Sequence, residues 1–446
     1  AEIYGEGVWF DNPVTELTDI TPANGFYFMS LSELIDKCYD YLETGFEGVS
    51  SRRTISWIDW LDPSLTQDAL IRKWNFIVPA YEGLCAELCL WKAACIEGLT
   101  PDATTASPEV LPYYQRAADV LLAAINVYVN DSGKSGNPGY WLPNNATNGK
   151  YKANNGLFGG PTPYEQGTAS AIIYDYTCNQ TNRLFYHFSN EYPNKYLLRP
   201  SEVGMNRFLD SEFNPGGGSN EDRYKGNFGT SSGQRYIAKY RSVGSTIRVN
   251  PYQDDHMIYI YRTNQYHLML AEALNHLKRF TACSGVFNSG VKKEIYVDGD
   301  PEWLGFTRNW TGDAEWGTRG YPSAGLHMSY CSQARPVVTS LVGTTEHDAF
   351  KFNDLQMLDE CMMEFICEGK IYPMMNRMAV RYGDLSIVAD RVCPKYAETG
   401  KEDEIRAKIM AGGNWVKYDL QVVGQELTAP AAPVTPEETP STTPEE

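Results

Sequence analysis

Hydrophobic side chains recur every three or four residues in several segments of this 446-residue chain. That spacing is typical of amphipathic helices, because it places the apolar residues on one face. The first such segment extends to about Leu42, and either Ser30 or Ser32 is placed to cap its beginning. The sequence therefore predicts a helix over this segment.

A second helical pattern covers residues 67 to 97, and a third covers residues 114 to 128. Pro79 should break or kink the second pattern near its middle, and Gly98 should end it. Both helices are rich in small residues, which are Ala86, Ala93 and Ala94 in one and Ala117, Ala118, Ala123 and Ala124 in the other. Small side chains let helices approach closely, so we expect an antiparallel hairpin of the tetratricopeptide type.

Two later segments, residues 258 to 280 and 355 to 377, show the same helical spacing. Pro373 should kink or end the second of them. This second segment carries a stripe of carboxylates four residues apart, Glu360, Glu364 and Glu368. Residues on one regular helix lie too close and too parallel to flank a substrate bond, so we expect the stripe and Arg262 to pair with neighbouring helices rather than to act in catalysis.

The remaining segments differ in composition. Residues 130 to 167 and 214 to 233 are rich in Gly, Asn or Ser, which predicts long irregular loops, while residues 235 to 242 alternate briefly and predict a short strand. Residues 426 to 446 contain five Pro, five Glu and five Thr with no aromatic or basic residue, which predicts a disordered tail. We therefore expect an all-α domain over residues 1 to 425, built from helical hairpins with large irregular loops and minor short strands.

The charge balance excludes some partners. The chain has 56 acidic and 38 basic residues, and the resulting net charge of −18 repels nucleic acid and anionic lipid. It also has 30 Tyr, 17 Phe and 10 Trp, far more than a disordered acidic chain would carry. The composition thus indicates a folded protein with enough aromatic side chains to place some of them on its surface.

The ten cysteines show no C-x-x-C spacing of a zinc or thioredoxin-like site. Cys85 and Cys89, like Cys361 and Cys367, lie in apolar helical segments, where free cysteine packs as a small hydrophobe. The even count also permits full pairing into disulfides. No apolar run of about 20 residues is present, and the sequence opens on Ala1 without a signal peptide, so we expect its targeting segment to be absent from this sequence.

Two motifs resemble one known family. YRTNQYHLMLAEALN, residues 261 to 275, resembles the "YR-x-aromatic-x-x-L-x-L-AEA-L-N" helix of the SusD/RagB family. ECMMEFICEGK, residues 360 to 370, resembles that family's later "E-R-x-x-E-x-x-x-E-G-x-R" helix. The helix pair at residues 81 to 125 and the segment NRLFYHFSNEY at residues 182 to 192 are similar in order as well, so the resemblance covers about residues 8 to 420.

The chain departs from that family pattern in two places. Cys361 and Met362 stand where relatives usually have basic residues, so any ion pair made there is lost. EIYGEGVWFDNPVTEL, residues 2 to 17, resembles a loop that family members place after their first helices. We therefore expect the family's N-terminal part, including its lipid-bearing cysteine, to be missing before Ala1.

The resemblance implies a binding protein rather than an enzyme. SusD-like proteins are lipoproteins on the outer face of the outer membrane in Bacteroidetes, where they cap a SusC-like TonB-dependent transporter and bind oligosaccharide or, in some members, peptide. For this chain the resemblance implies the same role in nutrient uptake, with no catalytic residues and no cofactor. The choice between glycan and peptide stays open, because both bind aromatic, amide-rich loops.

Loop aromatics are the candidate ligand contacts, because aromatic rings stack on the apolar faces of sugars. They are Tyr140 and Trp141 in the Asn/Gly-rich loop, and Trp303, Trp310, Trp316 and Tyr330 between the two motif helices. Relatives carry ligand contacts in the second of these regions. For each ring, the alternative is that it only anchors its own loop.

Asp298, Asp300 and Glu302 alternate as in a calcium-binding loop, but the glycine that such a loop requires is missing. The segment is thus either a weak calcium candidate or a plain acidic turn.

Two other functional classes stay open. A secreted glycan-active hydrolase on a helical scaffold would need two carboxylates about 5 to 10 Å apart, which the sequence does not exclude. A helical-repeat adaptor for protein partners fits the hairpins but leaves the aromatic loops unexplained.

Overall fold

Contacts within the chain divide it into two compact units, residues 1–34 with 415–446 and residues 35–414. The computed structural model describes residues 2–11, 15–16, 26–45, 80–130, 168–174, 179–182, 184–188, 197–210, 222–231, 233–240, 242–243, 246–247, 256–289, 334–415, 421–422 and 425–426.

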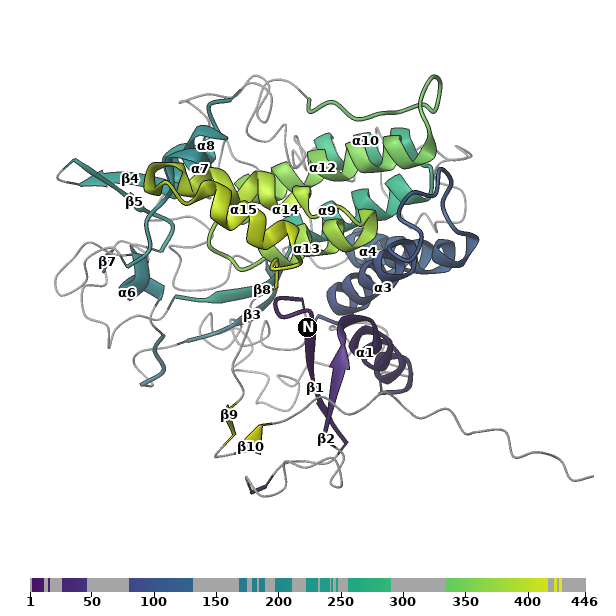
Figure 1. Ribbon diagram of the computed structural model, residues 1–446, viewed down its shortest axis with the longest axis horizontal. Helices are drawn as coiled ribbons and strands as arrows, with labels where there is room; N and C mark the ends of the chain where they lie inside the picture. The colour runs from purple at the N-terminus through teal and green to yellow at the C-terminus, as the bar shows by residue number, and fades with distance from the viewer. Residues whose placement is uncertain are drawn as a thin grey trace, which may run out of the picture. The chain divides into compact units, whose positions relative to one another are not determined.

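A hairpin of α3 (Tyr81–Glu97) and α4 (Leu111–Asn130) lies in the larger unit (Figure 1). The small residues between the two helices are buried, namely Ala86, Ala93, Ala94, Ala117, Ala118 and Ala124. A short 3-10 helix, η7 (Pro108–Val110), precedes α4, and the Ser107 side chain caps it by accepting from the Glu109 backbone N–H. The predicted hairpin is confirmed, with α3 ending at Gly98 and α4 beginning at Leu111 rather than at residue 114.

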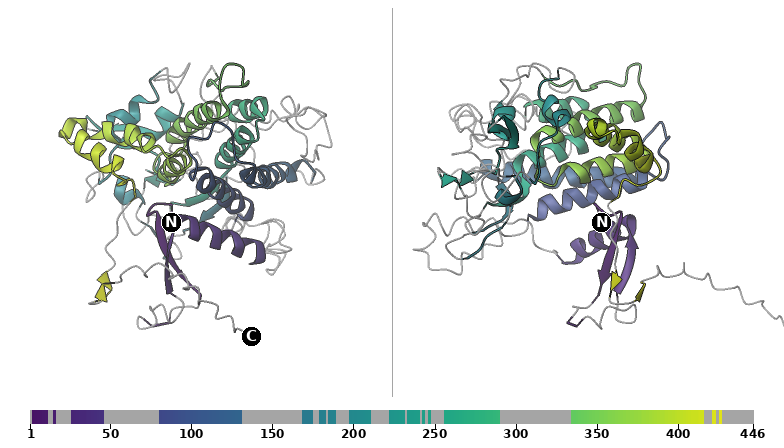
Figure 2. Two further views of the ribbon diagram at one scale, coloured as in Figure 1. Left: turned by 45° about the vertical axis from the view of Figure 1, so that its right-hand side comes forward. Right: turned by 60° about the vertical axis from the view of Figure 1, so that its left-hand side comes forward.

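Helix α9 (Thr263–His276) is buried along its whole length. It packs on α3, α4, α10 (Phe280–Ser289) and α12 (Glu346–Glu364). Helix α13 (Ile371–Tyr382) packs on both α12 and α3, so these helices surround α9 (Figure 2). The helical core of the larger unit is therefore built around one of the two motif segments.

Shorter elements complete the larger unit. The helices are α6 (Leu184–Phe188), α7 (Glu202–Asn206), α8 (Asp222–Asn227), α14 (Ser386–Val392), η11 (Cys393–Thr399) and α15 (Glu402–Met410). The strands form antiparallel pairs, β3 (Thr168–Ile172) with β8 (Ile258–Arg262), β4 (Phe228–Ser231) with β5 (Gln234–Ile237), and β6 (Ser242–Val243) with β7 (Thr246–Ile247). Strands β3 and β8 contribute Ala171 and Tyr259 to an apolar cluster with Phe208, Phe228 and Met363.

In the smaller unit, β1 (Glu6–Phe10) pairs with β2 (Phe26–Ser30), and β9 (Gln421–Val422) pairs with β10 (Gln425–Glu426). Helix α1 (Leu31–Gly45) follows β2 directly. The Glu33 carboxylate accepts from the Ser30 backbone N–H at 2.8 Å, and the Ser30 hydroxyl accepts from the Glu33 N–H at 3.4 Å. This reciprocal pair is a capping box, so Ser30 rather than Ser32 begins the predicted helix.

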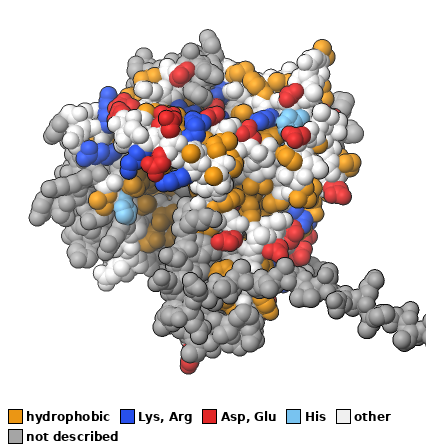
Figure 3. Space-filling view, viewed as in Figure 1, with side chains coloured by type: hydrophobic (Ala, Val, Ile, Leu, Met, Phe, Trp, Pro, Cys, Tyr) orange, Lys and Arg blue, Asp and Glu red, His pale blue; other side chains and the backbone are white. Residues whose placement is uncertain are grey.

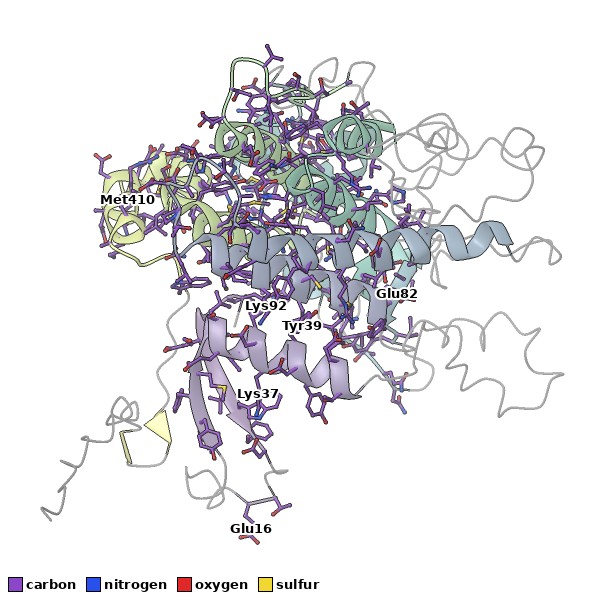
Figure 4. All side chains as sticks on the ribbon, turned by 90° about the vertical axis from the view of Figure 1, so that its right-hand side faces the viewer. Glu16, Lys37, Tyr39, Glu82, Lys92 and Met410 are labelled. Atoms are coloured by element: carbon purple, nitrogen blue, oxygen red, sulfur yellow. The ribbon has the colours of Figure 1, made fainter. Side chains whose placement is uncertain are left out.

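The later turns of α1 pack against α3 within the larger unit. Tyr39 and Lys92 point toward one another, with the Lys92 ammonium 5.5 Å from the centre of the Tyr39 ring (Figure 4). The same ammonium binds the Asp36 carboxylate at 2.5 Å. An ion pair and a cation–π contact thus fix this helix on the hairpin.

The predicted fold class is confirmed for the residues that the structure describes, which are mainly helical with strands of two to five residues. The predicted strand is present as Gln234–Ile237. The predicted loop over residues 214 to 233 is wrong in its second half, where Asp222–Asn227 forms α8 and Phe228–Ser231 forms β4, which has β5 as its pairing partner. Three predictions lie wholly or mostly outside the described residues: the helical pattern at 67–79, the loop over 131–167, and the tail after Glu426. The extent of the domain stays a prediction.

The prediction of one helix over residues 258 to 280 is wrong at its beginning. Residues Ile258–Arg262 form strand β8, and α9 starts only at Thr263. Isoleucine and tyrosine alternate in IYIY, and β-branched and aromatic side chains favour a strand when another strand is available to pair. Strand β3 supplies that partner.

The break in the second motif segment lies earlier than predicted. Helix α12 ends at Glu364, and the chain then turns through Cys367 and Gly369, which have φ of 59° and 77°. Pro373 does not end a helix but lies in the first turn of α13, where its missing N–H has no intrahelical acceptor to lose. The left-handed turn, and not the proline, separates the two helices.

Replacing Gly98 by Ala should lower the stability of the fold. The Gly98 φ of −63° is helical, so backbone preference alone would favour Ala. A Cβ atom there would lie 2.5 Å from the Val380 carbonyl oxygen, which belongs to the backbone of α13. We expect Gly98→Ala to reduce the free energy of unfolding by about 1 to 3 kcal/mol in urea titrations. Leu99→Ala, at a neighbouring side chain that is 81% exposed, is the control and should change little.

Candidate functional site

The glutamate stripe of the second motif binds basic side chains from other elements. Glu360 accepts from the Arg223 guanidinium at 2.5 Å. Arg262, the last residue of β8, donates to Glu364 at 3.1 Å and to Glu368 at 2.6 Å. The prediction that Arg262 and the stripe pair with neighbouring elements is confirmed, and the two motif segments are joined directly.

Further polar side chains complete this first network. Asn264 donates to Glu364 at 2.7 Å, and Lys239 donates to Glu368 at 2.5 Å. All three glutamates are almost fully buried, each with side-chain exposure of 3% or less. Burial lowers the pKa of Lys239, and the Glu368 carboxylate opposes that shift. Because the three carboxylates are buried and bound to side chains of other elements, they hold those elements together and are not available to a substrate.

Through Arg335, the first network extends to the two ends of residues 290–333. This segment contains four of the candidate aromatics, Trp303, Trp310, Trp316 and Tyr330. Arg335 donates from Nε to Glu360 at 3.2 Å. Its backbone N–H donates to the Asn288 side chain at 2.9 Å, and its carbonyl accepts from the same amide at 3.2 Å. Asn288 precedes residues 290–333 and Arg335 follows them, so the two ends of that segment are joined at a buried point.

A second buried network lies at the other end of α9. Glu272 accepts from Arg377 and from Arg381, both at 2.7 Å. Arg381 also donates to Asp354 at 2.6 Å and lies 3.2 Å from Glu97. Helices α3, α9, α12 and α13 each supply one or more of these groups, so the network fixes the helical core.

His276 is the titratable centre of the second network. Its Nε2 lies 3.0 Å from Asp354 and its Nδ1 lies 3.4 Å from Glu97. Burial disfavours the charged ring, but the two carboxylates outweigh burial and raise the pKa of His276 to about 9, against a smaller opposing effect of Arg381. The Tyr114 ring stacks on the imidazole at 4.4 Å. Because both ring nitrogens face carboxylates, His276 is not placed to act as a general base.

Two pockets are lined entirely by described residues of the larger unit. One lies beside the α3–η7 connection, where Thr100, Ser107 and His347 join Glu97 and His276. Its cavity volume is about 30 Å³. A single water needs about 10 to 15 Å³ on this measure, so this pocket holds a few waters rather than a sugar ring.

The other pocket lies among α3, α9, α12 and α13, and we call it the Gln265 pocket. Its lining consists of Glu87, Gln265, Leu268, Met269, Glu272, Cys361, Phe365, Lys370, Pro373, Met374 and Arg377. The cavity volume is about 20 Å³, enough for one small group. No pattern in the sequence indicates this pocket, because its lining comes from three segments that lie about 180 and about 90 residues apart along the chain.

The cysteine prediction is confirmed for Cys85, Cys89 and Cys361, which are buried in helices, and the described cysteines are free thiols. It is wrong for Cys367, which is exposed and lies in the left-handed turn after α12 rather than in a helix. A hydrogen bond with Cys89 lowers the pKa of Cys85 to about 7 against the effect of burial, and Arg116 contributes in the same direction.

The sequence-predicted ligand contacts lie outside the residues that the structure describes. These are Tyr140, Trp141, Trp303, Trp310, Trp316 and Tyr330, and the calcium candidates Asp298, Asp300 and Glu302 lie outside as well. Within the described ranges, no group of three or more His, Cys, Asp or Glu side chains is placed to hold a metal ion. No helix in those ranges is long and apolar enough to cross a membrane.

No family model and no curated protein matches the chain. Among solved structures, the chain is similar to a SusD superfamily protein from Bacteroides fragilis, with 15% sequence identity and a TM-score of 0.45. The similarity covers 86% of this chain and 66% of that one, so this chain spans just under two thirds of its length.

Removing one charge from the first network should be costly. Glu364→Gln leaves Arg262 and Arg223 with less negative charge in a buried site, and breaking a buried pair in this way costs about 3 to 5 kcal/mol. We expect that decrease in the free energy of unfolding measured by urea titration. Glu404→Gln removes an exposed partner of Lys408 on α15 and is the control. Equal stability of the two variants would contradict a structural role for the stripe.

The His276 site predicts weaker folding at alkaline pH. The folded-state pKa of about 9 lies above the value of 6.5 for an ordinary histidine, so the folded state binds the proton more tightly. The stabilisation is fully present below pH 6.5 and disappears as pH rises through 9. The free energy of unfolding should fall by roughly 3 kcal/mol over that interval. His276→Gln should remove this slope, and an unchanged slope in the variant would contradict the assignment.

Proposed function

We propose that this chain is a SusD-like nutrient-binding protein that captures oligosaccharide, or peptide, at the cell surface and delivers it to a SusC-like TonB-dependent transporter. One observation carries the proposal. The second motif, through Glu360, holds Arg335, and Arg335 with Asn288 joins the ends of the segment that contains Trp303, Trp310 and Trp316. The motif residues thus support the base of the loop to which the resemblance assigns ligand contacts.

The chemistry of the described residues agrees with binding rather than turnover. The buried carboxylates of both networks face arginine, lysine or histidine, as a structural role requires and as a hydrolytic pair does not. On the face shown in Figure 3, acidic and basic side chains of the described residues are interspersed among apolar ones. A neutral ligand suits such a surface. In this proposal the protein is held on the outer face of the outer membrane by a lipid anchor, as the resemblance implies.

The loop aromatics should dominate ligand affinity. Replacing Trp303, Trp310 and Trp316 together by Ala should weaken binding by about 1 to 3 kcal/mol for each ring that stacks on the ligand, a magnitude taken from base stacking on aromatic side chains. Isothermal titration against a panel of soluble glycans and peptides measures the change. The double variant Tyr140→Ala, Trp141→Ala tests the other loop in the same way. Unchanged affinity in the triple variant would remove its loop from the site.

The two alternative classes give different results in the same panel. A hydrolase would release products from a polysaccharide, and removal of a single carboxylate would abolish that release. An adaptor would bind a protein surface and none of the glycans or peptides. Either result would overturn the nutrient-binding proposal.

A further inference from the structure

The Gln265 pocket has a buried floor and a half-buried rim. All of its lining residues are buried except Glu87 and Lys370. The floor comes from α9 and the end of α12, and one wall comes from α13, which presents Lys370, Pro373, Met374 and Arg377 at helical spacing. Glu87 and Lys370 are therefore the lining residues that solvent reaches most readily.

The floor contains a polar atom that has no hydrogen-bond partner among the described residues. Gln265 is 7% exposed, and its Oε1 accepts no hydrogen bond from any described residue. A buried acceptor in this state is unfavourable, because it has given up its hydrogen bonds to water and gained none in return. The other polar groups of the floor are satisfied, because Glu272 binds Arg377 and Arg381. Gln265 is thus the side chain of the pocket whose acceptor has no donor among the described residues.

The two rim residues, Glu87 and Lys370, carry opposite charges, and both contact the side chain of Tyr261. The Tyr261 hydroxyl donates to the Glu87 carboxylate, and the Lys370 ammonium lies 5.1 Å from the centre of the Tyr261 ring. The ring lies against α3 at Gly83, where a Cβ atom would come within 2.8 Å of it. The absence of a side chain at Gly83 therefore fixes Tyr261, and Tyr261 fixes the spacing of the rim charges.

We infer that the Gln265 pocket is a ligand subsite that takes one hydroxyl group of a neutral carbohydrate. The hydroxyl donates to Gln265 Oε1, while Lys370 and Glu87 bind its neighbours on the sugar ring as donor and acceptor. The inference rests on the proposed function and deepens it, because it favours a glycan over a peptide and places one ligand-binding group on the scaffold rather than on the loops.

The volume of the pocket and the charges on its rim favour a neutral hydroxyl group as the bound group. A volume of about 20 Å³ admits one small group that protrudes from its ligand, as a sugar hydroxyl does. A backbone N–H of a peptide is flanked by Cα and carbonyl atoms and does not fit. A serine or threonine hydroxyl fits, but it brings no neighbouring hydroxyl groups for Lys370 and Glu87, as a sugar ring does. Lys370 repels an ammonium group, and Glu87 repels a carboxylate. A neutral group that both donates and accepts is favoured.

Two variants test the subsite. Gln265→Leu keeps the approximate size of the side chain and removes the acceptor, and Lys370→Met removes the rim ammonium. We expect each to weaken binding of a neutral oligosaccharide about tenfold, the effect of removing one hydrogen bond to a ligand hydroxyl. The probe is whichever gluco-, manno- or xylo-oligosaccharide binds the unmodified full chain best in isothermal titration. Gln115→Leu on α4, outside the pocket, is the matched control and should bind normally.

The melting temperature separates a binding role from a structural one. Because no described residue donates to Gln265 Oε1, Gln265→Leu should leave the melting temperature unchanged or raise it while affinity falls. Normal affinity in both pocket variants would overturn the inference, since the pocket would then hold only water. Weakened peptide binding with normal glycan binding would overturn the choice of carbohydrate. If the unmodified chain binds no oligosaccharide or peptide, the proposed function itself fails.

Discussion

The contact between Arg262 and the two glutamates, Glu364 and Glu368, is the interaction on which the rest of the larger unit depends. Arg262 has extended backbone dihedrals, φ −120° and ψ 156°, at the point where β8 becomes α9. Its guanidinium binds both carboxylates, donates to the Glu364 carbonyl and lies 4.6 Å from the centre of the Phe365 ring. A charge so buried is tolerated only when fully paired, so the strand, the helix and the turn after α12 must meet in one arrangement.

Helix α9 shows why two networks are needed rather than one. A helix buried on every side normally carries apolar residues, yet α9 has Asn264 near its beginning and Glu272 and His276 near its end. These three groups find partners on α3, α12 and α13. Gln265 lies between the two networks along the helix and belongs to neither. The pocket around it therefore contains a buried acceptor that no described residue satisfies.

The features of this structure that can be predicted are those that depend on residues close together in the sequence. The α3–α4 hairpin follows from periodic apolar and small residues, and the capping box of α1 follows from Ser30 and Glu33, three positions apart. The stripe of glutamates is visible in the sequence, but Arg223 is 137 residues from Glu360, and no short-range signal connects them. The helical prediction for residues 258 to 262 is wrong because the choice between strand and helix depends on β3, about ninety residues earlier.

The scaffold and the loops also differ in what constrains them. Within the scaffold, the guanidinium of Arg335 binds Glu360 and Gln356, while its backbone is bound by Asn288. Substitution of any of these residues would leave a buried polar group unsatisfied, so the ends of residues 290–333 cannot move apart without a cost to folding. A loop on a fixed base can in general change its sequence, and with it its ligand, without changing the scaffold. Residues that fix the base therefore indicate a fold more strongly than they indicate a ligand.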